Sequence, residues 1–386
     1  MFSRRLLPHA EQNALSKALA VLRAERALIV DLTESNPTRA AIPYPDDLLA
    51  SLGDSRALRY EPHPFGIPSA RDAVAADQQR RGARVDPARV VLTSSSSEAY
   101  GWLFKLLCIP GEGVLVPQPS YPLFEYLTAL DGVRVHTYAL EYHGHWTIDI
   151  DAIAAASGDI RAVMVVSPNN PTGSYLDEDQ FRHLSKICRE RRWALIADEV
   201  FVDYPLDVTN PLTDIAARDE VLSFTLAGLS KSVGLPQLKL GWCIVGGPQP
   251  ERDAALSALE LIADSYLSVG TPVQIALPEL LNRGAAVRTA IQERIRQNLS
   301  VLKAAVGRHA ECDLLRTEGG WSAIVRVPAT RSEEQLVLDL LRTERILVHP
   351  GYFFGFPYEA HVVVSLLPPP HVFEGAIARL LTFVNS

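Results

Sequence analysis

The chain has 386 residues, 47% of them hydrophobic and 21% charged, and this length allows a sizeable core divided between two domains. Its formal net charge of -8 argues against nucleic acid or an anionic membrane surface as a partner, because both attract basic surfaces. No run approaches the roughly 18 apolar residues of a membrane-spanning helix, and no hydrophobic signal segment follows Arg4 and Arg5, so we expect a cytoplasmic protein.

The first part of the chain predicts a segment ahead of the main domain. Apolar residues at helical spacing predict an amphipathic helix over about 10–26, and a short strand is expected at 28–32. Polar, turn-rich loops at 33–38 and 59–66 precede a helix expected at about 68–81. We expect residues 1–44 to pack with the smaller of two domains.

From residue 90, short apolar runs alternate with helical segments such as 98–107, 121–131 and 178–191. Seven runs predict strands: 90–92, 113–116, 133–135, 162–166, 194–197, 221–224 and 242–245. The alternation predicts an α/β domain at residues 45–275, with a mostly parallel seven-stranded sheet covered by helices.

The remaining residues, 276–386, predict a smaller α+β domain. A long helical pattern covers 284–309, and a final helix is expected at about 370–383. Between them, strands are expected within 319–327, 345–348 and 361–365.

The spacing of cysteines and histidines indicates no metal site. The four cysteines are far apart, without a C-x-x-C pair, and most lie in apolar runs, which favours reduced core thiols. His143 and His145 lie in an expected turn and have no third ligand at suitable spacing.

Ligands of parallel α/β sheets bind at the carboxyl ends of the strands, so the residues directly after each strand are the candidates for a site. Ser94, Ser95, Ser96 and Ser97 come after the first strand and open a helix, where free N–H groups, hydroxyls and the helix dipole favour a phosphate. One serine can cap the helix, with Glu98 as capping partner, while others face a ligand.

Three further strand ends carry groups that suit a planar, charged ligand. Tyr121 lies among prolines and could present its ring to such a ligand. Asn170 belongs to a turn at 167–173 that is dense in Pro, Asn and Gly. Asp198 comes directly after a buried strand, where a carboxylate is costly unless it meets a cation or a donor.

Lys231 comes after the next strand, in an apolar segment punctuated by Gly and Ser. Burial lowers the pKa of a lysine and makes its amine a nucleophile that can form a Schiff base; by itself, however, the segment favours a surface lysine in a loop. Phosphate donors, an aromatic plane, an asparagine, a carboxylate and this lysine at neighbouring strand ends together fit pyridoxal phosphate, a planar phosphorylated aldehyde.

The ordered set Asn170, Asp198 and Lys231, with its Asn-Pro-Thr-Gly and Ser-Lys sequences, resembles that of the fold-type I pyridoxal-phosphate enzymes, specifically the class I/II aminotransferases. The resemblance spans nearly the whole chain, from Asn36 to Gly351. It implies an enzyme that transfers an amino group from an amino acid or amine to an oxo acid through the pyridoxamine form of the cofactor.

The resemblance also implies roles for individual residues. Lys231 would hold the cofactor as an internal aldimine and then act as general base and acid, while Asp198 would pair with the pyridinium nitrogen. Asn170 would donate to the phenolic oxygen and Tyr121 would stack on the ring. The positions implied for the phosphate are Ser96, Ser97, Ser230 and Lys239, with Tyr60 reaching the neighbouring subunit's phosphate in a homodimer with shared sites. Substrate-facing loops would contain Asn36 and Trp321.

Four positions depart from the family pattern. Phe201 stands where a tyrosine usually donates to the phenolic oxygen, Gly228 replaces a frequent phosphate-binding serine, and Lys239 replaces an arginine. Val363 stands where an arginine usually clamps the substrate's α-carboxylate. The explanations open to us are a shift in alignment, a donor held differently, or replacement by another cation: Arg39, Arg326 or Lys239.

Phe201 and Val363 therefore leave alternatives beside the aminotransferase. One is lyase, oxidase or cyclase chemistry with the same cofactor. Another is a non-catalytic ligand-binding relative on this fold, which the presence of Asn170, Asp198 and Lys231 disfavours.

Overall fold

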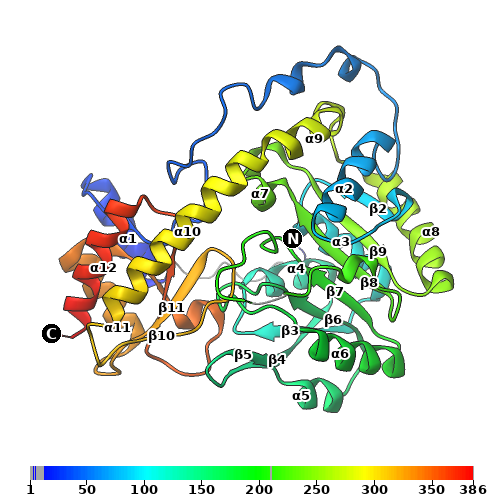
Figure 1. Cartoon of the computed structure of the whole chain (residues 1–386). Coiled ribbons are helices and arrows are strands. Elements are labelled where there is room, and N and C mark those ends of the chain that lie inside the picture. The colour runs from blue at the N-terminus through cyan, green and yellow to red at the C-terminus, as the bar shows by residue number, and fades with distance from the viewer. Residues whose placement is uncertain (1–2, 4, 6–12, 209–210, 386) are drawn as a thin grey trace.

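The structure is a computed structural model that describes the chain except residues 1–2, 4, 6–12, 209–210 and 386. It contains a large sheet flanked by helices and a smaller sheet, with the long helix α10 (Ala285–Val306) running between the two parts (Figure 1). The segment at 41–67, which includes short 3-10 helices at Ala50–Gly53 and Ser55–Leu58, arches over α9 (Thr271–Arg283), which both 3-10 helices contact (Figure 1).

The large sheet has eight strands in the order β2-β9-β8-β7-β6-β3-β4-β5. Their bounds are β2 (Val90–Thr93), β9 (Gly241–Gly246), β8 (Ser223–Gly228), β7 (Ala194–Asp198), β6 (Ile160–Val166), β3 (Gly113–Gln118), β4 (Arg134–Tyr142) and β5 (Trp146–Ile148). Strands β8, β7, β6, β3 and β4 pair in parallel, while β9 is antiparallel to both neighbours and β5 is antiparallel to β4. The mostly parallel arrangement was predicted.

The predicted number of seven strands was wrong, because β5 had been missed. This edge strand is only three residues long and pairs with a part of β4 that extends beyond its predicted end, with Leu140 opposite Ile148. His143 and His145 form the exposed turn between the two strands, as expected, and His143 pairs with Glu141.

Helices cover both faces of the large sheet, because alternate residues of each buried strand point to opposite sides. On β7, Ile196 packs with the cluster beneath α3 (Ser96–Leu107), α4 (Leu123–Asp131) and α8 (Gln249–Tyr266). Leu195 packs with the cluster beneath α5 (Ile150–Ala155) and α6 (Glu178–Arg191). Helices α2 (Pro68–Arg80) and α9 (Thr271–Arg283) pack together beside β2.

The smaller sheet is antiparallel, in the order β10-β11-β14-β13. Its strands are β10 (Asp313–Leu314), β11 (Ser322–Arg326), β14 (His361–Ser365) and β13 (His349–Pro350), and it packs with α10, α11 (Glu333–Glu344) and α12 (Pro370–Val384). Strand β1 (Val30–Asp31) pairs in parallel with β12 (Ile346–Leu347), and α1 (Ala14–Ala24) packs on α11. The predicted boundary at 275/276 falls inside α9, and the division into domains stays a prediction.

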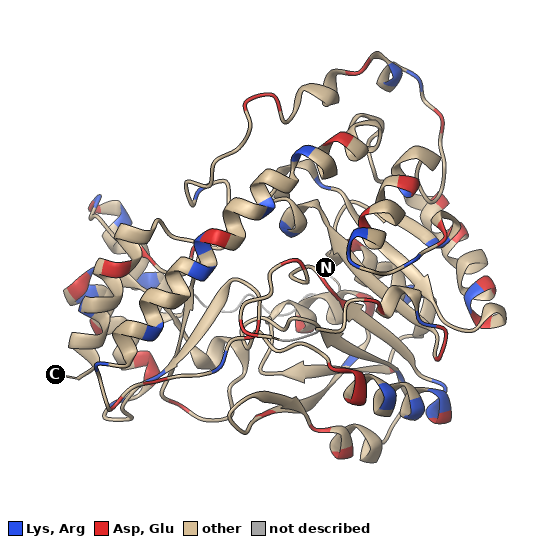
Figure 2. Ribbon diagram, in the orientation of Figure 1, with Lys and Arg blue, Asp and Glu red and all other residues tan. Residues whose placement is uncertain are grey.

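Charged residues lie mostly on the helices and connecting segments, and the strands of both sheets are nearly free of them (Figure 2). No helix in the described part of the chain is long and apolar enough to cross a membrane. The four cysteines are free, and three of them are buried: Cys188, Cys243 and Cys312. No cluster of side chains suited to a metal occurs among the described residues.

Candidate active site

Lys231 lies on the short helix α7 (Leu229–Ser232), which comes directly after β8. Its side chain keeps partial access to solvent, and its Nζ lies 4.8 Å from the centre of the Trp321 ring and 5.3 Å from that of Phe201. Burial lowers the pKa of Lys231 to about 8, against the opposing charge of Asp198. The share of neutral, nucleophilic amine near neutral pH is therefore larger than for an ordinary lysine.

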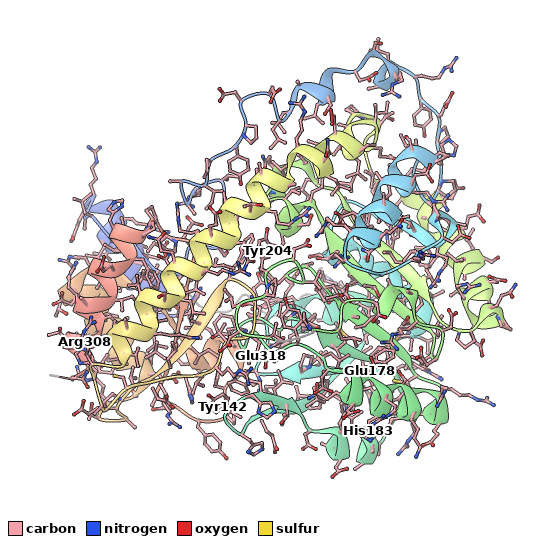
Figure 3. The ribbon with its side chains drawn as sticks, viewed as in Figure 1. Tyr142, Glu178, His183, Tyr204, Arg308 and Glu318 are labelled. Carbon is pink, nitrogen blue, oxygen red and sulfur yellow. The ribbon has the colours of Figure 1, made fainter. Side chains whose placement is uncertain are left out.

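Two side chains from other elements hold the backbone around Lys231. The Tyr204 hydroxyl donates to the Lys231 carbonyl at 2.5 Å, and Arg288 Nε donates to the Ser232 carbonyl at 2.9 Å. Tyr204, labelled in Figure 3, lies beside α10, the helix that carries Arg288. Arg288 also lies 3.6 Å from Asp77 and 3.8 Å from Asp203. The sequence did not predict a role for Tyr204 or Arg288, because no local sequence pattern shows that a side chain will donate to a distant backbone carbonyl.

Asp198 ends β7, the strand next to β8, and its side chain is buried. It accepts a hydrogen bond from the Tyr100 hydroxyl at 2.8 Å and another from the Val200 N–H at 3.0 Å. Burial raises the pKa of Asp198, while these two bonds and the charge of Lys231 oppose the rise. Tyr100 was also missed, because it reads as one more apolar position of an amphipathic helix.

The N-terminus of α3 lies close to the end of β8. Ser95 caps the helix by accepting from the Glu98 N–H at 3.1 Å, and Glu98 accepts from the Ser94 N–H at 2.6 Å. A serine cap with Glu98 taking part was predicted, and the structure confirms both. Ser96 and Ser97 form the first turn, so their N–H groups have no carbonyl one turn earlier in the helix and stay available to an anion.

Two glycines bring this helix end against the segment of Lys231. A Cβ atom on Gly241 of β9 would lie 3.3 Å from the Ser96 nitrogen, and a Cβ on Gly228 would lie 2.8 Å from the Gly241 Cα. The absence of both side chains lets three backbones converge, with Ser230 two residues beyond Gly228. A serine at position 228 would require the backbone to move, so Gly228 is a consequence of this packing.

Asn170 connects the large sheet to the smaller one. Its Oδ1 accepts from the Ser322 Oγ at 3.3 Å, and its side chain is half-buried. The neighbouring Asn169 is buried and donates to the Pro119 carbonyl at 3.0 Å, and it accepts from Ser120 at 2.8 Å. These bonds hold the turn after β6 against the loop after β3.

The structure brings some predicted site residues together but not all of them. Lys231 lies against Phe201 and Trp321, whose rings are 5.2 Å apart, and the charge of Asp198 acts on Lys231. Four other predicted site residues have no contact with Lys231 within the described part of the chain. They are Tyr60 (75% exposed), Tyr121 (48% exposed), Lys239 (exposed) and Asn36, whose Oδ1 accepts from Thr38.

Val363 lies in β14 opposite Ile324 and His349, and it is buried among apolar side chains. Two of the three cations considered as replacements for an arginine here already have carboxylate partners. Arg39 pairs with Glu34 at 3.2 Å, and Arg326 pairs with Asp313 at 2.8 Å.

Comparison with known proteins identifies the family of the chain. A model of the family described as aminotransferase class I and II matches residues 29–373. The glutamate-pyruvate aminotransferase AlaA of Haemophilus influenzae is 26% identical over 376 residues, 95% of this chain and 93% of that protein. The alanine aminotransferase of Mycobacterium tuberculosis is 28% identical over 380 residues, 95% of this chain and 88% of that protein.

A relative named for another activity matches at similar identity. The S-alkyl-thiohydroximate lyase of Arabidopsis thaliana is 25% identical over 361 residues, 89% of this chain and 76% of that protein. Among solved structures, the alanine aminotransferase of Pyrococcus furiosus superimposes with a TM-score of 0.88 at 22% identity, and the match covers 100% of each chain. This likeness shows that the two chains share a fold.

Proposed function

The chain belongs to the class I and II aminotransferases, and we propose that it moves an amino group from an amino acid to a 2-oxo acid with Lys231 as the residue that carries its pyridoxal phosphate. One observation carries this proposal: a lysine with a lowered pKa lies at the end of β8, while a buried carboxylate, Asp198, ends the adjacent strand. The lysine amine would bind the cofactor's aldehyde, and the carboxylate would pair with its ring nitrogen.

The residues of this chain fit the cofactor. The N–H groups of Ser96 and Ser97 in the first turn of α3, together with Ser230, offer donors for its phosphate, and Gly228 and Gly241 leave the backbone open at that point. Asp198 has two hydrogen bonds, and its carboxylate keeps acceptor capacity for a protonated ring nitrogen.

When bound, the cofactor supplies an aldehyde for the lysine amine and a ring that withdraws electrons from the substrate Cα. The Lys231 amine would hold this aldehyde and, when free, would take and return the proton at the substrate Cα. Tyr204 and Arg288 hold the backbone that sets the position of this amine. Phe201 and Trp321 surround the amine with aromatic surface, which limits the water beside it.

The carrier role of Lys231 is tested by covalent trapping. Wild-type protein loaded with pyridoxal phosphate and reduced with borohydride should carry the cofactor on the peptide that contains Lys231, as read by mass spectrometry. Lys231→Ala should lose this label. Lys186→Ala, which changes a surface lysine on α6 beside Glu190, should keep it. Labelling at another lysine, or no uptake by the wild type, would contradict the proposal.

The names of the relatives suggest which substrates to test first. Glutamate and alanine as donors, with pyruvate and 2-oxoglutarate as acceptors, are the pairs that these names indicate. Turnover that requires both a donor and a 2-oxo acid supports transamination.

Lyase chemistry is the second candidate, because a lyase is among the relatives and because Phe201 and Val363 replace the tyrosine and the arginine of the family pattern. Release of a thiol or of ammonia from a single substrate, without any oxo acid, would favour it. The same mixtures therefore decide between the two reactions.

A homodimer with shared sites, to which Tyr60 contributes, belongs to the same proposal. Its support is that Tyr60 is 75% exposed on the segment that arches over α9 (Figure 1). A cytoplasmic location stays a prediction from the sequence.

A further inference from the structure

We propose that Tyr100 is a positioning residue, which holds Asp198 as a carboxylate aimed at the ring nitrogen of the cofactor; this inference rests on the proposed function. Tyr100 touches neither Lys231 nor, in this proposal, the substrate, and it acts through Asp198. Its hydroxyl donates to Asp198 Oδ2 across 98 positions of sequence, from α3 to the end of β7.

The hydrogen bonds of Asp198 leave room for one more donor. Tyr100 binds Oδ2 and the Val200 N–H binds Oδ1, so the carboxylate is held at both oxygens and cannot rotate freely. An ionised carboxylate accepts about four hydrogen bonds. The acceptor positions that remain are available to a donor in the site.

Packing holds the phenol in place for this bond. The Tyr100 ring stacks on Phe104, with centroids 6.1 Å apart, and meets the edge of Phe124 at 5.5 Å. Tyr100 is almost fully buried, and burial raises the pKa of its hydroxyl well above the usual range. The phenol therefore stays a donor throughout the working range of pH.

The effect on Asp198 depends on the groups that face it. Burial disfavours the negative charge of Asp198, whereas Tyr100, the Val200 N–H and Lys231 favour it; burial and the charge of Asp198 in turn raise the pKa of the neighbouring Glu199. Among the favourable groups, Tyr100 gives a short hydrogen bond to the charge itself. Loss of its hydroxyl raises the proton affinity of the carboxylate, which then draws the proton away from the ring nitrogen and weakens the electron sink.

The test is Tyr100→Phe, which removes one oxygen and leaves the ring between Phe104 and Phe124. Tyr138→Phe is the matched control, because Tyr138 is also a buried tyrosine whose hydroxyl donates one 2.8 Å bond, to the Met164 carbonyl. Both variants lose one buried hydrogen bond, and only the first loses a bond to Asp198.

The direct measurement is the nitrogen-15 NMR shift of labelled cofactor bound to each protein. Wild type and Tyr138→Phe should show a protonated ring nitrogen, and Tyr100→Phe should shift towards the unprotonated value. In Tyr100→Phe, the acid limb of the pH–kcat/KM profile should move to higher pH, and kcat should fall about 10- to 100-fold, as for a lost bond to a charged group. In an Asp198→Asn background, Tyr100→Phe should change neither quantity further.

Two results would overturn the inference: an unchanged nitrogen-15 shift and pH profile in Tyr100→Phe, or equal changes in both tyrosine variants. If Tyr100→Phe does not fold, infrared spectroscopy of the cofactor-loaded wild type measures the protonation state of Asp198 instead. Comparison with Asp198→Asn identifies the bands that belong to the Asp198 carboxyl group. An ionised Asp198 at pH 6 supports the inference, and a protonated one ends it. Failure of the wild type to take up the cofactor at all would instead remove the proposed function.

Discussion

At the scale of single residues, the chemistry depends on how little water reaches Lys231 and Asp198. The lysine amine faces two aromatic rings, and the carboxylate is 8% exposed. Burial acts on the two groups in opposite directions, since it lowers the pKa of a base and raises that of an acid. For Asp198, two hydrogen bonds and the charge of Lys231 oppose this effect and favour the carboxylate, whereas for Lys231 burial outweighs the charge of Asp198 and favours the neutral amine.

The rate of cofactor attachment should depend on pH through Lys231. Only the neutral amine attacks an aldehyde, and burial lowers the pKa of this amine to about 8. The rate should therefore rise with pH up to about 8 and level off above it, measured by stopped-flow absorbance on cofactor-free protein. An ordinary lysine would let the rate rise to about pH 10, and a rise of that kind would contradict the burial of Lys231.

At the scale of elements, the site depends on three backbone segments that pack closely because glycines stand at their contacts. Gly228 ends β8 and lies against Gly241, which begins β9, and the start of α3 packs on Gly241. A side chain at Gly241 would push the helix end away, and one at Gly228 would push β9 away from the segment of Lys231. The position at which the family frequently has a serine is thus a place where this chain packs backbone on backbone.

Gly228→Ala should therefore destabilise the protein and weaken phosphate binding. The new Cβ would lie 2.8 Å from the Gly241 Cα, and backbone cannot rotate away as a side chain can. We expect a loss of about 1–3 kcal/mol in the free energy of unfolding, and weaker binding of inorganic phosphate by calorimetry.

Gly375→Ala is the control for that substitution. Gly375 lies within α12 with nothing inside 4 Å of its ideal Cβ, so alanine should stabilise the protein by about 0.5–1 kcal/mol through helix propensity. Equal changes in the two variants, measured by denaturant unfolding, would show that the contact at Gly228 has no energetic effect.

At the scale of the whole molecule, the segment at 41–67 leaves large apolar side chains in contact with water. Leu58 is 91% exposed and Tyr60 is 75% exposed on this segment. A second copy of the chain would cover them, and this is the arrangement that the resemblance implies for Tyr60.

Leu58→Asp should accordingly weaken self-association by at least about tenfold in Kd, since it places a charge in an apolar contact. Sedimentation equilibrium measures the effect. Leu28→Asp changes a leucine that is 93% exposed next to β1, so it controls for the general effect of an added charge. A wild type that sediments as a monomer would contradict the proposed dimer.

Local patterns were enough to predict most of the elements. The helix at 178–191 and the strand at 361–365 were predicted with the bounds that the structure has, because their periodicity and end signals lie within a few residues of one another. Strand β5 could not be predicted in this way, since three residues carry too little pattern and their pairing with β4 supplies most of the evidence for a strand.

From the amino-acid order alone, a lysine, a carboxylate and a serine-rich helix start could be assigned to the ends of strands in one sheet, because parallel strands direct their carboxyl ends to one edge. Only the tertiary structure shows which groups position the lysine and the carboxylate. Tyr100 meets Asp198 across 98 positions, and Arg288 meets the Ser232 carbonyl across 56. Such contacts leave no periodic signal in the chain, because they depend on how whole helices pack against the ends of the strands.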